Sequence, residues 1–383
     1  MNRTLLLKLH RYVGLALAGL LIVLGATGSA IVFEPELDAW LNPELFRIDR
    51  PGGKALPPGE LIRRVEADDP RIRAYYLTLA DRPEKAAVAY VAPRTDPATG
   101  EPFDVAYDEV FIDPVSGGIN GRRLWGECCL ERPNLMPFLY KLHNRLLLPM
   151  DIGRPLIGIV ALLWLGLAVV GGYLTFPRGG PFFRRWRRNW SVGRGRTGFH
   201  TGLRLHRAGG LWLWPVIVAV ALTGAMLGFE GSLRSVVGSI SPSEETVWEA
   251  YADRDDVPAE PVSYTAALAA ARNRVRRAGE TGGPDHISYA GERGLYRVAF
   301  GDPDGFGLGT TTVYVDGRDG RVVGMTGPGD GSAGDVLLRA GQPLHAGRIA
   351  GAPGRIAVFL AGLVVVLLSV TGVVMWWLRR RRQ

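Results

Sequence analysis

Four long apolar runs dominate the hydropathy pattern of this chain. They cover residues 12–33, 155–176, 208–229 and 356–378, and none of them contains Asp, Glu, Lys or Arg. Each run has about the 20 residues that a helix needs to cross the hydrocarbon layer of a bilayer. One charged side chain at the centre of such a helix costs roughly 2.5–3.5 kcal/mol on insertion scales. The pattern therefore predicts four transmembrane helices.

The chain is built from two copies of one unit, and the copies can be aligned without gaps over the first apolar run. Gly171 of the first copy aligns with Gly372 of the second. The matching segments are Leu-His-Arg at 9–11 and 205–207, Thr-Gly at 27–28 and 223–224, and Leu-His at 142–143 and 344–345. Internal repeats determine architecture, so the four helices are expected as two duplicated pairs.

A polar segment separates the two apolar runs of each copy, at 34–154 and at 230–355. Both segments are too long for loops and are large enough for small domains. Periodicity predicts one helix and then three strands in each. The helices are expected near 58–67 and 264–278, and the strands near 72–80, 86–92 and 109–113, and near 286–290, 296–300 and 311–316. Each last strand ends in Asp, at Asp113 and Asp316, before a Gly-containing turn, which predicts a β-hairpin finish.

Basic residues beside the runs predict the orientation. The 383 residues are 47% hydrophobic with a net charge of +8, and nine arginines and no acid lie in 177–207. By the positive-inside rule this loop and both basic termini are cytoplasmic, and the two polar segments face the other side. The expected parts are 1–33, start and first span; 34–154, first outer module; 155–176, second span; 177–207, cytoplasmic loop; 208–229, third span; 230–355, second outer module; and 356–383, fourth span and tail.

Two alternatives bear on this organisation. The first run has the basic start and small residues of a cleaved signal peptide, but it continues through 31–33 and its repeat lies in the middle of the chain. A nucleic-acid partner would require a basic folded domain, and the basic residues instead follow the membrane topology. The fold class expected is thus a membrane protein with four transmembrane α-helices and two small α+β modules outside.

Four of the six histidines stand near the ends of the runs. His10 and His206 begin the first and third runs on the cytoplasmic side, and His143 and His345 precede the second and fourth runs on the outer side. A histidine at membrane depth is costly unless it binds a ligand, pairs or faces water. Repeat and sidedness agree on the same two pairs, and two imidazoles can supply both axial positions of one iron. Since the chain has no Cys-x-x-Cys-His sequence, we expect two b-type haems per chain.

Other readings of these residues stay open. Zinc or copper also accepts imidazole, although a closed zinc site needs four ligands. His200 lies six residues before His206 and has no repeat, so it is a secondary candidate that could replace His10 or His206. Arg145 and Arg348 are candidate partners for haem propionates on the outer side. Thr27-Gly28 and Thr223-Gly224 are interpreted as helix-packing residues, and Cys128-Cys129 as a pair in a loop rather than an electron relay.

The module of one helix and strands that ends in an Asp turn, next to spans that begin Leu-His-Arg-x-x-Gly-Leu, resembles the PepSY domain with its PepSY-associated transmembrane helices. The resemblance covers nearly the whole chain and is closest in kind to iron-regulated inner-membrane members, among them siderophore-linked reductases of ferric chelates such as ferrioxamine. It implies a bacterial inner-membrane oxidoreductase with periplasmic modules and a ferric siderophore as electron acceptor. The electron donor is not indicated, because no Gly-rich nucleotide or flavin fingerprint is present.

A second function is compatible with the same pattern. The two outer modules could bind a peptide or a protease while the helices only anchor them in the lipid. A transporter is a third reading that the paired halves suggest, but the two copies have the same orientation and no matched charged site in the middle of the spans.

Overall fold

The computed structural model separates the chain into two compact units. The structure describes residues 2–381 except 81–82, 129–130, 194–196, 242–246, 253, 255, 259 and 303–304. A helical unit comprises Met1–Glu34, Leu139–Ile240 and Leu337–Gln383, and a sheet unit comprises Pro35–Phe138 and Ser241–Val336. The chain therefore passes between the units four times.

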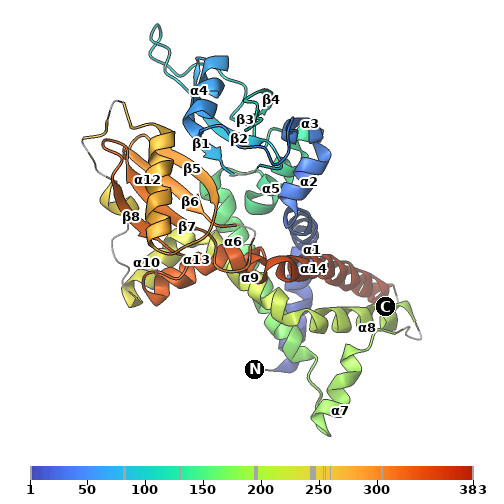
Figure 1. The fold of residues 1–383 in the computed structure, drawn as a ribbon. Helices are drawn as coiled ribbons and strands as arrows, with labels where there is room; N and C mark the ends of the chain where they lie inside the picture. The colour runs from blue at the N-terminus through green and yellow to red at the C-terminus, as the bar shows by residue number, and fades with distance from the viewer. Residues whose placement is uncertain are drawn as a thin grey trace. The chain divides into compact units, whose positions relative to one another are not determined.

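Three helices of the helical unit are long and apolar enough to cross a membrane. They are α1 (Arg3–Ile31), α6 (Met150–Leu174) and α14 (Gly351–Arg380), which follows the short η3 (Arg348–Ala350) (Figure 1). α1 packs against α14 and α6, and its first turn is capped by Asn2, whose side chain accepts a hydrogen bond from the Thr4 amide. The first, second and fourth apolar runs thus form continuous helices.

The third apolar run differs from the expected single helix over 208–229. It is divided between α8 (Gly198–Trp212) and α9 (Trp214–Gly228), which are bent by 70° at Leu213. Pro215 explains the break, because proline has no amide hydrogen and its ring clashes with the carbonyl one turn earlier. Gly19 stands at the matching position of the first copy, and α1 continues through it. The described helices give four spans only if α8 and α9 are counted as one.

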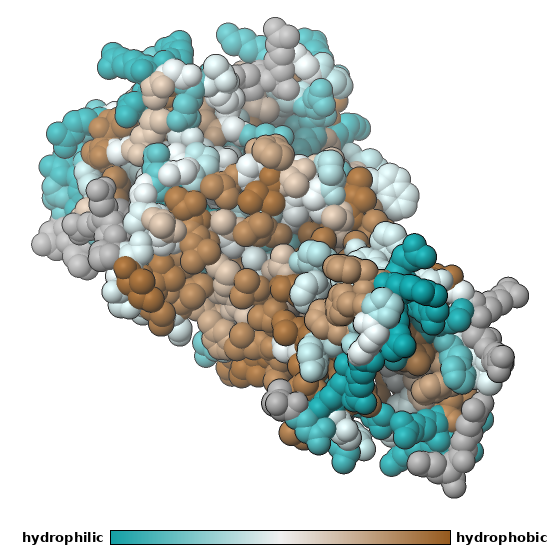
Figure 2. All heavy atoms as spheres, turned by 90° about the horizontal axis from the view of Figure 1, so that it is seen from below, coloured by the Kyte–Doolittle hydropathy of each residue, from teal (hydrophilic) through white to brown (hydrophobic). Residues whose placement is uncertain are grey.

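The outward faces of these helices are apolar. On α6, Ile159, Leu162 and Leu163 are exposed, and α14 exposes Leu360 and Leu363. Apolar residues cover a broad area of the face shown in Figure 2. A monomeric soluble protein rarely exposes so large an apolar patch, and lipid is the solvent that such a surface suits.

Short helices complete the helical unit and its borders. α5 (Leu135–Arg145) and α13 (Ala333–His345) carry His143 and His345, and the unit boundaries fall within both helices. The loop after α6 contains α7 (Phe182–Trp186) and η2 (Arg187–Trp190), and α10 (Glu230–Ile240) follows α9. Cys129, the arginines 194 and 196 of the basic loop and Arg382 of the basic tail lie outside the described residues, and Cys128 is disulfide-bonded.

The sheet unit contains one antiparallel sheet of eight strands rather than two separate sheets. The order is β4-β3-β2-β1-β5-β6-β7-β8, so two four-stranded meanders meet at the β1–β5 pair, where Leu77 lies opposite Ile287. The strands are β1 (Ile72–Thr78), β2 (Ala87–Pro93), β3 (Glu109–Ile112), β4 (Ile119–Arg123), β5 (Pro284–Ala290), β6 (Leu295–Phe300), β7 (Thr311–Asp316) and β8 (Val322–Thr326). Each copy thus has one strand more than the three expected, because the hairpin after Asp113 or Asp316 is completed by β4 or β8.

One face of the sheet is covered by two helices that contact each other, α4 (Pro58–Asp68) and α12 (Tyr264–Arg277). α12 lies across β5, β6 and β7 (Figure 1). Val65 and Ala271 of these helices are buried with Leu77 and Ile287 in one core. The remaining elements of this unit are α2 (Glu34–Leu41), α3 (Pro43–Phe46), η1 (Arg132–Asn134) and α11 (Val247–Ala250). The two modules therefore share a single hydrophobic core.

The two aspartates that end β3 and β7 organise the following turns. Asp113 accepts hydrogen bonds from the amides of Val115 and Ser116, at 2.8 and 3.2 Å. Asp316 accepts one from the amide of Arg318 at 2.8 Å. Gly117 and Gly320 close the turns with φ of +75° and +74°, a backbone conformation that glycine adopts without steric cost. This explains the Asp-turn-Gly pattern of both copies.

Candidate functional site

The structure brings the four candidate histidines together as two pairs. The first pair is His10 of α1 and His206 of α8, whose ring centroids are 6.2 Å apart. The second pair is His143 of α5 and His345 of α13, with centroids 6.3 Å apart. These are the pairs that repeat and sidedness indicated, and the chain distances within them are large, so tertiary packing alone brings the rings together.

Both separations suit one metal ion between two imidazoles. An imidazole nitrogen binds a first-row metal at about 2.0–2.1 Å. With ring bonds of about 1.35 Å, that nitrogen lies about 1.15 Å from the centroid of its own ring. Two imidazoles on opposite sides of one metal therefore have centroids about 6.4 Å apart. The observed 6.2 and 6.3 Å match this separation and also lie within the range of about 4.5–7 Å for aromatic rings in edge contact.

Each ring of the second pair is held through its Nδ1 atom. His143 Nδ1 lies 3.1 Å from Thr27 Oγ1 and 3.1 Å from the Leu24 carbonyl oxygen. His345 Nδ1 lies 3.1 Å from Thr223 Oγ1 and 3.2 Å from the Val220 carbonyl oxygen. Thr27 and Thr223 are matching residues of the two copies, so the same arrangement is built twice.

The threonine hydroxyl determines which nitrogen carries the proton. Thr27 Oγ1 donates its single hydrogen to the Val23 carbonyl at 2.7 Å, and Thr223 Oγ1 donates to the Ala219 carbonyl at 2.7 Å. A hydroxyl that has donated its hydrogen can only accept from a third group, and a carbonyl also only accepts. Nδ1 of His143 and of His345 must therefore be protonated. Nε2 of each ring then keeps the lone pair that a metal needs.

His206 of the first pair is held in the same way. Its Nδ1 lies 3.0 Å from Thr371 Oγ1, and Thr371 Oγ1 donates to the Leu367 carbonyl at 2.7 Å. This arrangement assigns the proton of His206 to Nδ1 as well. A second nitrogen that donates to a carbonyl or similar acceptor is the usual companion of a metal-binding histidine.

A glycine follows each of these threonines and lies against the histidine ring. A Cβ on Gly28 would come within 2.8 Å of His143 Cε1, and one on Gly224 within 3.2 Å of His345 Cε1. A Cβ on Gly372 would be 3.9 Å from His206 Cε1. We call residues 27–28, 223–224 and 371–372 the Thr–Gly motifs. Each one orients a ring with its hydroxyl and makes room for that ring with its glycine.

The Thr–Gly motifs were not recognised as functional from the sequence. Residues 27–28 and 223–224 were interpreted as helix packing, and Thr371 was not singled out. The sequence does hold a signal, since all three motifs lie near the end of an apolar run. That signal gains meaning only when the helices are placed, because Thr27 and His143 are separated by 116 residues.

His10 is the exception among the four. A Cβ on Gly171 would lie 2.9 Å from His10 Cε1, so a glycine again faces the ring. The residue before Gly171 is Val170, at the position that Thr371 occupies in the second copy. His10 Nδ1 is buried and makes no hydrogen bond of good geometry among the described residues, although the Leu167 carbonyl lies near the ring as the Leu368 carbonyl lies near His206. The first pair thus has one ring with a Thr–Gly motif and one without.

The other candidate residues occupy different places. His200 is near the start of α8, where its Nδ1 lies 2.8 Å from Thr197 Oγ1, and the two histidine pairs do not include it. Arg145 at the end of α5 and Arg348 in η3 are half-buried, and their contact with haem propionates stays a prediction. His286 contacts Asp285 in the sheet unit. Among the described residues, no group of three or more His, Cys, Asp and Glu could hold a metal ion, so each pair offers two protein ligands.

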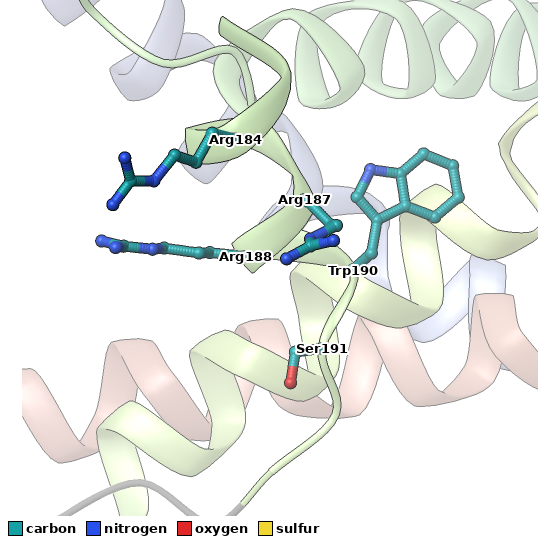
Figure 3. Close-up of a pocket in the computed structure, with 5 residues that line it drawn as sticks. All are labelled: Arg184, Arg187, Arg188, Trp190 and Ser191. Carbon is teal, nitrogen blue, oxygen red and sulfur yellow. The ribbon is translucent and has the colours of Figure 1, made fainter. Parts of the chain in front are cut away.

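A separate cavity of about 460 Å³ lies in the loop after α6 and is lined by Arg184, Arg187, Arg188, Trp190 and Ser191. Arg184 and Arg188 extend in the same direction (Figure 3). The loop is attached to the end of α6, where Thr175 accepts hydrogen bonds from Trp186 Nε1 at 3.0 Å and from Asn189 Nδ2 at 2.7 Å. Guanidinium groups and tryptophan suit the interface between lipid headgroups and water. We therefore assign this cluster to anchoring.

The comparison with known proteins bears on the family of this chain. A search of curated proteins finds no match to this chain. The family model described as the PepSY-associated TM region matches residues 7–379. Because this match covers nearly the entire chain, the protein belongs to the family of PepSY-associated transmembrane proteins.

Proposed function

We propose that this protein is a transmembrane di-haem oxidoreductase. One haem b would be held by His10 and His206, and a second by His143 and His345. The observation that supports this most directly is the combination of ring spacing and proton placement: both pairs have a centroid separation that suits an axially ligated iron, and the Nε2 lone pair stays free on His143, His345 and His206. An iron porphyrin needs only two axial protein ligands, whereas a closed zinc site needs four.

The two pairs are spaced suitably for transfer across a bilayer. His10 and Thr27, which contacts His143, lie on the same helix and are 17 residues apart (27 − 10). At about 1.5 Å per residue the separation along α1 is about 25 Å, close to the thickness of a hydrocarbon layer. Haem provides one-electron chemistry at each end. The protein's own part is to hold the rings and to exclude water from the apolar helices around them.

The arginine distribution supports an orientation with the first pair at the cytoplasmic side. Arg3 donates to the Leu174 carbonyl at 2.6 Å, so the start of α1 and the end of α6 lie together beside the arginine-rich loop. By the positive-inside rule these ends face the cytoplasm. We therefore propose a bacterial inner-membrane protein with cytoplasmic termini and a periplasmic sheet unit.

The acceptor we propose is a periplasmic ferric siderophore, on the basis of the family resemblance. One electron from an unidentified cytoplasmic donor would reduce the chelated Fe(III) to Fe(II). Hard oxygen ligands hold Fe(III) more tightly than Fe(II), so reduction would release the iron for uptake. No covalent step on the protein is required.

The test is a haem assay with a reduced-minus-oxidised spectrum on the purified full-length protein. We expect about two b-type haems per chain, and about one in each of the alanine variants of His10, His206, His143 and His345. His200→Ala is the matched control and should keep both. A protein that takes up no haem in any preparation would contradict the proposal, and a sheet unit that then binds a peptide would support the non-redox alternative.

A further inference from the structure

The first pair is held unequally. A backbone carbonyl lies near each ring, Leu368 for His206 and Leu167 for His10, but only His206 also has a threonine hydroxyl at Nδ1. His10 Nδ1 is buried and makes no hydrogen bond of good geometry among the described residues. The sequence difference that accompanies this is one residue, Val170 in place of the Thr371 of the other copy. Both residues precede a glycine that faces the ring.

We propose that position 170 determines how strongly His10 binds its metal, and that Val170 makes His10 the weaker ligand of the first pair. This inference rests on the proposed haem function, because it concerns the histidine as an axial ligand. Val170 is a positioning residue in this account, since it acts through His10.

The physical reason is the effect of a hydrogen bond on the far nitrogen of a ligand. An acceptor at Nδ1 fixes the rotation of the ring and increases the electron density that Nε2 donates. Loss of such a partner typically costs 10–100-fold in metal affinity. A more strongly donating imidazole also stabilises Fe(III) over Fe(II), and so lowers the midpoint potential of the haem.

A threonine at 170 could supply the hydroxyl acceptor that His10 lacks, with a side chain of nearly the same volume. Valine and threonine have nearly the same shape and differ by one hydroxyl. A helical threonine donates to the carbonyl three or four residues earlier, as Thr27, Thr223 and Thr371 do. Its oxygen would then be free to accept from His10 Nδ1, as Thr371 does for His206.

The experiment compares reciprocal variants in a chain that keeps only the first haem, His143→Ala with His345→Ala. Haem transfer to apomyoglobin and the midpoint potential are measured for Val170→Thr and Thr371→Val. We expect Val170→Thr to slow haem loss about 10-fold and to lower the potential, and Thr371→Val to do the reverse by a similar factor. Val169→Thr is the matched control, because this neighbour makes the same chemical change on an exposed face of α6 and should alter neither value.

The outcomes separate this inference from the haem proposal. If the protein binds haem and Thr371→Val accelerates its loss while Val170→Thr changes nothing, position 170 does not control His10. If neither variant differs from Val169→Thr, hydrogen bonds at Nδ1 do not set ligand strength here. If the double-alanine chain does not fold, the same variants are titrated in the intact protein, where only one of two potential steps should move. Absence of haem from the wild type would instead overturn the function itself.

Discussion

Both rings of the second histidine pair contact a threonine hydroxyl, whereas only one ring of the first pair does. Thr27 and Thr223, matching residues of the two copies, each hold one ring of the second pair. In the first pair the matching positions are Thr371 and Val170, and only the threonine makes the contact. The ring planes also differ, with interplanar angles of 49° in the second pair and 88° in the first. Three of the four rings thus contact a threonine, and at the fourth a β-branched residue without a hydroxyl stands in its place.

The largest effect on haem binding is expected from substitutions that fill the space beside the histidine rings, which the glycines leave open. Gly28→Ala and Gly171→Ala would place a Cβ at 2.8 and 2.9 Å from Cε1 of His143 and His10. Overpacking of this kind costs typically about 1–3 kcal/mol. We expect Gly28→Ala to reduce occupancy of the second haem and Gly171→Ala that of the first, by difference spectroscopy.

Gly372→Ala is the control for both substitutions. Its Cβ would lie 3.9 Å from His206 Cε1, an ordinary packing distance. A loss of haem as large as that of Gly171→Ala would show that the glycines act through helix packing rather than through contact with the rings.

An effect of intermediate size is expected when the threonine hydroxyls that contact the second pair are removed. Thr27→Val with Thr223→Val should make both of its ligands resemble His10, and each lost partner should weaken binding by about 10-fold or more. Haem transfer to apomyoglobin should then be faster from the second site than from the first. If the second site still releases haem more slowly, the threonines are not what distinguishes the pairs.

The smallest expected effect on the histidine pairs is that of a substitution in the sheet unit. There Arg123 contacts Asp38 and Glu109 in a buried cluster. Burial raises the pKa of Glu109 to about 7, so the folded unit holds a proton that the unfolded chain releases at lower pH. Stability from this group is therefore present below the unfolded pKa and is lost as the pH rises through about 7. Glu109→Gln should flatten this pH dependence in thermal unfolding and leave the haem spectrum unchanged. A shift of either haem band would show coupling between the carboxyl and the histidines.

Much of the architecture could be predicted from the sequence because its causes are local. Charge-free runs of sufficient length indicated the spans, and α1, α6 and α14 follow three of them. The break in the third run was missed although Pro215 was visible, because the apolar run continues on both sides of it. The joining of two modules into one sheet depends on the β1–β5 pairing between segments about 200 residues apart, which no local pattern specifies.

The sequence by itself determined the duplication, the spans and the pairing of the histidines, since repeat and charge distribution are properties of the linear chain. Only the tertiary structure decided which helix faces each ring. Contacts such as Thr27 with His143 and Thr371 with His206 depend on which faces of distant helices meet, and side-chain geometry then assigns the proton to Nδ1. For the same reason Val170 carries no signal in the linear sequence. It is one more apolar residue in a span until the structure shows that His10 Nδ1 is buried and lacks the hydroxyl contact that the other three rings have.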